Sequence, residues 1–380
     1  MNTYVASHLK DMNRQIVYQL IETLGTTSKA ELAKRTGISS PTIIKVINYL
    51  ISKNLVIEIG EGESAIGRKP QLLTLNRSLM YTAAFLIEGD HLTMGVVNIV
   101  GEVIFRKSLC VELDICTLLD RIIDELLEPL LKEAGVPMKK LVGIGLAVPC
   151  IYDSETRCIS SSPLIGVENT LFIGDRLDRL SQKYNVHVQV ENDVNAQVLG
   201  EYQITEAPQN TDLVFISVGT GLGAGIILDG KLRYGPHNMC GEIGSFVFQK
   251  NENRPQKGGW LESQISSRML KERFGLSFDR NAPKADPVTL SQAIDYLVPL
   301  LAPCINNISA LLDCRSIVLG GIIADALGPQ LIERIQQELL LFCRFDFTLK
   351  QPASPDVGLI GIASLITAQK VLALLTEQDT

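Results

Sequence analysis

Acidic and amide side chains stand beside glycine-rich turns at three places in the second half of the chain. Asn192 and Asp193 directly follow an apolar run, Glu242 lies in the segment GEIG, and Glu262 follows GGWL. Carboxylates and an amide that converge on a pocket suit a polyhydroxyl ligand, because each carboxylate accepts two hydroxyl hydrogens. Singly, Asp193 is explained as a helix N-cap and Glu262 as a surface helix residue. Together, between glycine-rich turns, they favour a binding site.

A glycine-rich stretch, LVFISVGTGLGAGIILDGK from Leu213 to Lys231, is the most distinctive local pattern. It predicts a buried strand, a glycine-rich corner and a second strand that ends at the turn Asp229-Gly230. Glycine permits positive φ and close approach to the main chain, so backbone N–H groups at the corner could cradle phosphate. The alternative is a tight hairpin whose glycines only permit packing, and the run alone does not decide between them. The phosphate-loop-like residues are Gly219, Thr220, Gly221 and Gly223.

Composition indicates a soluble globular protein of two or three domains. The chain has 380 residues, 46% of them hydrophobic and 20% charged. No apolar run approaches the ~18–20 residues that span a bilayer, and no signal peptide opens the chain, so we expect a cytoplasmic protein without membrane contact. None of the eight cysteines forms a CxxC pair, and we expect them to be reduced and mostly buried.

Charge is unevenly distributed along the chain. Residues 1–70 carry nine Lys or Arg against six Asp or Glu, a balance of +3, while the remainder carries 26 against 36, a balance of −10. A basic head on an acidic body places any nucleic-acid contact in the head, although a solvated face often reaches such a charge.

The head shows the order of elements of a winged helix-turn-helix. A helix is predicted over Asn13–Leu24, and a capping box of Ser28 and Glu31 opens a short second helix. A third helix is expected over Pro41–Ser52, followed by a strand, a hairpin tip and a return strand over Gln71–Leu75. The third helix would enter the major groove of DNA. The alternative is a small helical domain used for protein contacts.

The candidate DNA-contacting residues lie on the third helix and beside the wing. Polar residues at the start of the helix are expected on base edges, others share its exposed face, and two basic residues of the wing would reach phosphates or a minor groove. They are Ser39, Ser40, Thr42, Lys45, Asn48, Arg68 and Lys69.

Beyond the head, strands alternate with helices. Strand triplets followed by helices occur twice, which predicts two α/β lobes with a ligand cleft between them.

These motifs, in this order, resemble the ROK family of sugar-responsive repressors and sugar kinases. The head and GRKPQLLTLN are similar to its repressor branch, and VENDVNA, SVGTGLGAGII, GEIG, GWLE and IVLGGII are similar to its body motifs. The resemblance covers nearly the whole chain. It implies an α/β fold with a winged helix-turn-helix over residues 1–70 and a two-lobed, actin-like (ribonuclease H-like) ATPase-fold body over 71–380. Lobe one would comprise about 71–190 plus 358–376, and lobe two about 191–357.

The resemblance also implies roles for single residues. Asp193 stands at the position of the kinases' catalytic base, and Glu242 and Glu262 at those of sugar-contacting glutamates. Asn192 lies beside Asp193, and Ser245 stands where the family has a histidine that contacts both sugar and a structural zinc. The zinc cysteine positions hold Asn253, Pro255 and Trp260, and since tetrahedral zinc needs four ligands we expect no metal and no cofactor.

Kinase chemistry would need a further motif. The family's kinases have a DxGGT turn for ATP phosphates and Mg²⁺, whereas the matching hairpin here reads LIEGDH from Leu86 to His91. We therefore expect a regulator that is not an enzyme, binding an operator in double-stranded DNA as a homodimer or higher homo-oligomer. A sugar or sugar phosphate in the cleft would control it. The alternatives are an ATP-dependent sugar kinase with an attached head and a scaffold in which neither site works; the acidic residues and the amide kept in the body argue against the scaffold.

Overall fold

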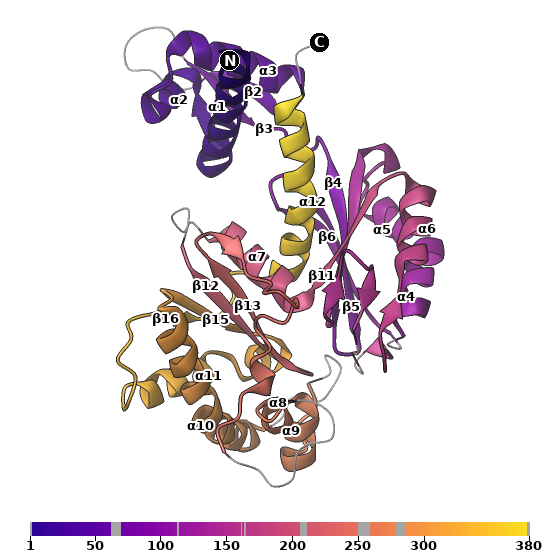
Figure 1. Cartoon of the computed structure of the whole chain (residues 1–380), viewed down its shortest axis with the longest axis vertical. Helices are drawn as coiled ribbons and strands as arrows, with labels where there is room; N and C mark the ends of the chain where they lie inside the picture. Colours follow the sequence, from indigo (N-terminus) through magenta and orange to yellow (C-terminus); the bar gives the residue numbers. More distant parts are fainter. Residues whose placement is uncertain are drawn as a thin grey trace.

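Three helices and a three-stranded sheet form the N-terminal head (Figure 1). The computed structural model describes residues 2–61, 70–111, 114–160, 162, 165–205, 211–249, 259–278 and 286–377. The sheet has the strand order β1-β3-β2, with antiparallel pairing throughout. The head elements are α1 (Asn2–Leu24), β1 (Thr26–Ser28), α2 (Lys29–Thr36), α3 (Ser40–Ser52), β2 (Val56–Glu61) and β3 (Gln71–Leu75).

Local chemistry explains the boundaries of the head helices. Ser28 accepts a hydrogen bond from the Glu31 N–H at 3.3 Å, which confirms the predicted N-cap of α2. Gly37 ends α2 in the left-handed conformation at φ 68°, and α3 has proline in its first turn. The helix α1 begins at Asn2 rather than Asn13, because no glycine or proline interrupts the chain before the apolar spacing starts.

The expected end of the head at residue 70 falls just before β3. This strand pairs with both β1 and β2, so the head sheet continues to Leu75. The head core also includes Met80 and Ile99 from the following segment, which means that the head packs directly on the body.

The body begins with a five-stranded sheet, called sheet one here, of order β11-β7-β4-β5-β6. Its strands are β4 (Tyr81–Glu88), β5 (His91–Asn98), β6 (Val103–Cys110), β7 (Leu141–Val148) and β11 (His187–Asn192). The outer helices are α4 (Ile115–Arg121), which continues through a π-helical turn (Ile122–Leu126) into α5 (Leu127–Glu133), and α6 (Gly174–Tyr184). These helices cover one face of sheet one (Figure 1) and share its apolar core. A 3-10 turn (Met138–Lys140) and a small sheet of β8 (Tyr152–Asp153), β9 (Cys158–Ile159) and β10 (Leu171–Phe172) complete this half.

A second five-stranded sheet, called sheet two here, has the order β14-β13-β12-β15-β16. Its strands are β12 (Leu213–Val218), β13 (Leu222–Leu228), β14 (Lys231–Leu232), β15 (Ser316–Gly320) and β16 (Thr348–Lys350). The antiparallel pairing of β12 with β13 confirms the predicted hairpin. A 3-10 turn (Ile243–Ser245) and the helices α8 (Glu262–Ile265), α9 (Ser267–Phe274), α10 (Pro287–Leu312) and α11 (Ile322–Leu339) belong to this half.

Two crossing helices lie between the sheets: α7 (Asp193–Ile204) and α12 (Val357–Thr376) (Figure 1). Glycine allows their close approach, since a Cβ built at Gly200 would lie 1.8 Å from the Val357 carbonyl oxygen. A Cβ at Gly361 would lie 1.8 Å from the Ala196 carbonyl oxygen. The first part of α12 packs in the interior of the body, and its last part packs in the core of the head.

By length and composition alone, α10 and α12 are apolar enough to cross a membrane. In the structure, however, α10 packs in the core beside sheet two, and α12 packs on α7 and sheet one. Core helices of globular proteins have the same composition.

Candidate functional site

The strand β11 delivers Asn192 and Asp193 to the start of α7. The Asn192 Oδ1 accepts hydrogen bonds from the N–H groups of Val194 (2.9 Å) and Asn195 (3.1 Å). Asn192 is therefore the N-cap of α7, and Asp193 is the first helical residue rather than the cap. The capping explanation considered for Asp193 thus applies to its neighbour.

Glu191 is a buried carboxylate beside this pair that the sequence analysis did not single out. It accepts hydrogen bonds from the Asn192 N–H (2.8 Å), the Asn195 Nδ2 (3.0 Å) and the Tyr234 hydroxyl (2.8 Å). Tyr234 follows β14, so the last bond joins sheet two to sheet one. The only sequence signal for Glu191 was its place in VENDVNA, and nothing in the sequence connected it with Tyr234.

Four carboxylates act on one another electrostatically at the start of α7. Desolvation, followed by the charge of Glu88 and then that of Glu242, raises the pKa of Asp193 to about 7. Desolvation and the charge of Glu262 raise the pKa of Glu242. The structure therefore brings together the three acidic residues chosen from the sequence, and adds Glu88 at the end of β4.

The GEIG loop is held against β13 by its first glycine. The Ala224 N–H donates to the Gly241 carbonyl at 2.8 Å, and Gly241 has φ 94°, in the left-handed region. A Cβ at Gly241 would lie 1.7 Å from the Ala224 carbonyl oxygen. Glu242 and the exposed Ser245 follow this anchor, and the Ser245 N–H donates to the Glu242 carbonyl at 3.1 Å.

Glu262 joins the GEIG loop to the glycine-rich hairpin. Its Oε2 accepts a hydrogen bond from the Leu222 N–H at 3.2 Å, and would lie 3.1 Å from a Cβ at Gly244. One oxygen of Glu262 therefore positions the hairpin.

The glycines of the hairpin serve close packing. Among the described residues, the glycines with positive φ do not include Gly219, Gly221, Gly223 or Gly225. The freedom of glycine to adopt positive φ is therefore not used at this corner. A Cβ at Gly225 would lie 2.6 Å from the Val194 carbonyl oxygen on α7, so this residue must be small to let α7 pack on sheet two.

The hairpin corner also meets the turn that joins β4 to β5. A Cβ at Gly89, in that turn, would lie 2.9 Å from the Thr220 methyl carbon. The β4–β5 turn and the glycine-rich corner thus lie against each other across the two halves of the body.

A polar cavity of about 310 Å³, lined in part by Glu88, lies between the two halves of the body. Glu88 and Gln197, which are hydrogen-bonded at 3.2 Å, line it together with Asp325 of α11. Val357 and Gly358, the first residues of α12, also line it. The start of α12 thereby lines the same cavity as Glu88, whose charge also acts on Asp193.

Within the described ranges, no three His, Cys, Asp or Glu side chains are grouped as metal ligands. Of the positions compared with a zinc site, Ser245 and Trp260 are described, while Asn253 and Pro255 lie outside the described residues.

The candidate DNA-contacting residues lie mostly on the open face of the head. Ser39, Ser40, Lys45 and Asn48 are exposed, whereas Thr42 is half-buried and its hydroxyl lies 2.9 Å from that of Ser39. Arg68 and Lys69 lie outside the described residues.

Asp193→Asn should stabilise the protein at alkaline pH. The raised pKa means that the folded state holds a proton between about pH 4 and pH 7 that the unfolded state has lost. The wild type therefore loses stability as pH rises through this window, and the variant does not. We expect a gain of about 4 kcal/mol at pH 8 that disappears near pH 4, measured by urea unfolding. An equal effect at both pH values would contradict the pKa assignment.

Comparison with known proteins agrees with this architecture. The family model described as "ROK family" matches residues 87–369. The xylose repressor of Caldicellulosiruptor bescii is 32% identical over 266 residues, which cover 69% of this chain and 65% of that protein. The xylose repressor of Bacillus subtilis is 25% identical over 243 residues, 64% of this chain and 62% of that protein. The matches thus span less than two thirds of these relatives' own lengths.

Solved structures share the fold. A ROK family transcriptional regulator, a homologue of the E. coli MLC protein, superposes with a TM-score of 0.73 at 24% identity over 97% of this chain and 98% of that chain. A putative N-acetylmannosamine kinase from Listeria monocytogenes superposes with a TM-score of 0.62 at 23% identity, over 77% of this chain and 100% of that one. The match of the family model to most of the chain shows that this protein belongs to the ROK family.

Proposed function

We propose that this chain is a sugar-responsive transcriptional repressor. The head is a winged helix-turn-helix that binds an operator in double-stranded DNA, and the body binds a sugar or sugar phosphate between its halves. The observation that carries the proposal is the presence, in one chain, of an exposed polar face on α3 and a cluster of acidic residues contributed by both halves of the body. The names of the relatives, two xylose repressors and an N-acetylglucosamine repressor, support the same class of ligand.

The head supports DNA binding through its shape and its exposed polar residues. The helices α2 and α3 are joined by a turn at Gly37, and β2 and β3 form the base of a wing. Lys45 and Asn48 lie on the open side of α3, where a major groove would meet them.

The acidic site supports sugar binding through its supply of hydrogen-bond acceptors. The charge of Glu242 acts on Asp193 and that of Glu262 acts on Glu242, while Asn192 and Ser245 adjoin these residues in the sequence. A sugar hydroxyl that donates to Asp193 favours the ionised carboxylate. Sugar affinity is therefore expected to fall when pH drops below about 7.

The remaining assignments follow from this function. The head extends over about residues 1–75, the two halves of the body form the lobes, and α12 belongs with sheet one. The protein acts in the cytoplasm as a homodimer or higher homo-oligomer, because paired heads match the two half-sites of an inverted repeat.

A sugar kinase is the second candidate. Asp193, with a pKa near 7, suits a general base, and ROK kinases share the fold. Against it, the first turn lacks Gly-Gly-Thr, and Gly89 packs on Thr220 where two phosphate loops would face ATP. An ATP-coupled assay with sugars distinguishes the two functions.

Lys45→Ala should weaken operator binding about tenfold at fixed salt, because a side chain that contacts a base edge or phosphate is lost. Fluorescence anisotropy with DNA from upstream of the gene, with and without D-xylose or N-acetylglucosamine, measures both the affinity and the sugar response. Lys132→Ala, an exposed lysine of α5, is the matched control and should leave affinity unchanged. Absence of specific binding by the wild type under every condition would overturn the repressor proposal.

A further inference from the structure

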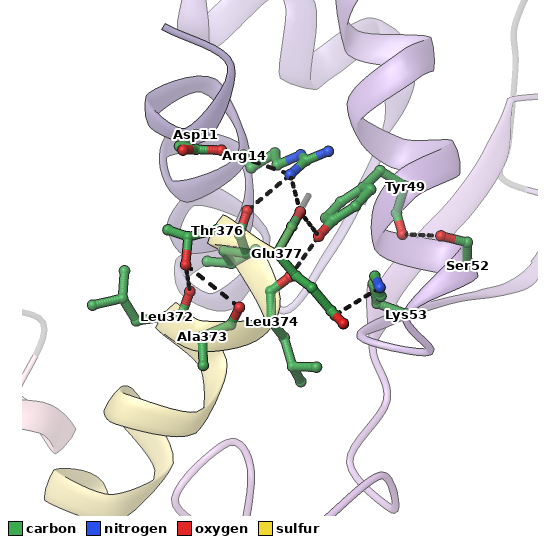
Figure 2. Close-up of polar contacts among 11 residues, drawn as sticks. Asp11, Arg14, Tyr49, Ser52, Lys53, Leu372, Ala373, Leu374, Thr376 and Glu377 are labelled. Carbon is green, nitrogen blue, oxygen red and sulfur yellow. Dashed lines mark hydrogen bonds and ion pairs between the residues drawn. The ribbon is translucent and has the colours of Figure 1, made fainter. Parts of the chain in front are cut away.

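The last carbonyl groups of α12 are bound by side chains of the head (Figure 2). The Arg14 Nη1 donates to the carbonyl oxygens of Leu375 (3.0 Å) and Glu377 (3.2 Å). The Tyr49 hydroxyl donates to the Leu374 carbonyl at 2.6 Å, with the Glu377 carbonyl 3.1 Å away. A helix end leaves its last four carbonyls without helical partners. The residue after α12, Glu377, is extended rather than in the left-handed conformation of a glycine cap. The head therefore completes the end of this helix.

The guanidinium group of Arg14 also stacks on the ring of Tyr49. The guanidinium carbon of Arg14 lies 3.2 Å from the centroid of the Tyr49 ring, and only 2% of the Arg14 side chain is exposed. Lys53 adds an ion pair with the Glu377 carboxylate at 2.7 Å. Positive charge at a helix C-terminus is favoured by the helix dipole. We call Arg14, Tyr49 and Lys53 the C-terminal clamp; its members come from α1 and α3, so the helix proposed to read DNA is one of its two supports.

Apolar packing reinforces the clamp. Val371 and Leu375 of α12 belong to the same buried cluster as Val17 and Ile21 of α1. The head and the end of α12 therefore share one core, and a shift of α12 acts on the head through packing as well as through hydrogen bonds.

The other end of α12 lies at the interior of the body. Val357 and Gly358 line the cavity that also contains Glu88, and Gly361 contacts α7, which begins at Asp193. A helix of 20 residues is about 30 Å long, so α12 connects the region of the acidic site to the head as one rigid element.

We propose that α12 transmits the state of the sugar site to the DNA-binding head, and that the C-terminal clamp is the link. The inference rests on the proposed function and specifies its regulation. A sugar that favours one arrangement of the two halves shifts α7 against α12, and the clamped head follows the end of α12. Paired heads would then change their spacing on DNA, which alters operator affinity.

The test compares Tyr49→Phe with Tyr184→Phe. Tyr49→Phe keeps the ring that stacks on Arg14 and removes the hydroxyl that holds α12. Tyr184→Phe removes a similar hydrogen bond, to the Ile123 carbonyl at 2.8 Å, between two helices of the body and outside the C-terminal clamp. Arg14→Lys is the second variant, since it keeps the charge but loses the guanidinium geometry. For each protein, operator Kd is measured by anisotropy with and without D-xylose or N-acetylglucosamine, whichever alters the wild type.

We expect the ratio of the two Kd values to fall at least about fivefold in Tyr49→Phe and Arg14→Lys, and to stay at the wild-type value in Tyr184→Phe. Operator affinity without sugar should change less than about threefold, because the DNA-facing residues are intact. The effect of DNA on sugar affinity should fall by the same factor, since coupling is reciprocal. An unchanged ratio in both clamp variants would overturn this inference while leaving the repressor function in place. A wild type that binds the operator but ignores every sugar would overturn the proposed function, and the inference with it.

Discussion

Gly361→Ala should cost about 3–5 kcal/mol of unfolding free energy, although alanine is the better helix former. In an open helix the change would gain about 1 kcal/mol. Here the added Cβ would lie 1.8 Å from the Ala196 carbonyl oxygen and 2.6 Å from the Gly200 nitrogen, both backbone atoms of α7. The two helices must separate, and both sheets pack on them. Urea unfolding followed by circular dichroism measures the loss.

Gly275→Ala is the control for this experiment. Gly275 ends α9 at φ 69° and has open space around it, so its replacement tests backbone strain without a steric clash. We expect a cost of about 1 kcal/mol there. A Gly361→Ala variant as stable as the wild type would show that α7 and α12 cross less tightly than the structure indicates.

Gly241→Ala should abolish the sugar response while the protein stays folded. The substitution places a Cβ 1.7 Å from the Ala224 carbonyl oxygen, at a residue with φ 94°. The loop must leave β13, and it carries Glu242 and Ser245 away from Asp193. We expect sugar affinity to fall more than about tenfold in isothermal titration, because each lost hydrogen bond to a charged group is worth about 1.5–3 kcal/mol.

Gly235→Ala provides the matched comparison in the same connection. Gly235 has φ 75°, but its nearest neighbour, the Cys240 Cβ, would lie 3.6 Å from the new atom. This variant shares the left-handed strain and lacks the clash, so it should retain sugar binding. Equal losses in the two variants would mean that general loosening of the loop, rather than displacement of Glu242, causes the effect.

Local patterns predicted most elements of the fold because their causes are local. The strand β3 has its predicted bounds, Gln71–Leu75, and α3 and the β12–β13 hairpin lie where apolar spacing and turn residues placed them. The short strands β8 to β10 were missed, since two-residue strands carry no periodicity.

For the acidic site, the sequence indicated which residues to consider, and the structure showed which of them lie together and which backbone groups they contact. Asp193, Glu242 and Glu262 were chosen because each follows a turn or strand end, and such ends gather where parallel strands meet. The structure adds two contacts that residue type did not indicate: Asn192 caps α7, and Glu262 accepts a hydrogen bond from the Leu222 N–H. Those contacts depend on which backbone groups come within hydrogen-bonding distance, and residue type does not contain that information.

The sequence by itself determined the order of elements, the head with its helical turn, the glycine-rich hairpin and the family resemblance. Only the tertiary structure decided that Tyr234 bonds to Glu191 and that Arg14 binds the Leu375 carbonyl, a pair separated by 361 positions. The physical reason is the distance along the chain over which each kind of interaction acts. Helix caps, turns and apolar periods act over a few residues, whereas contacts between distant segments depend on how the whole chain packs.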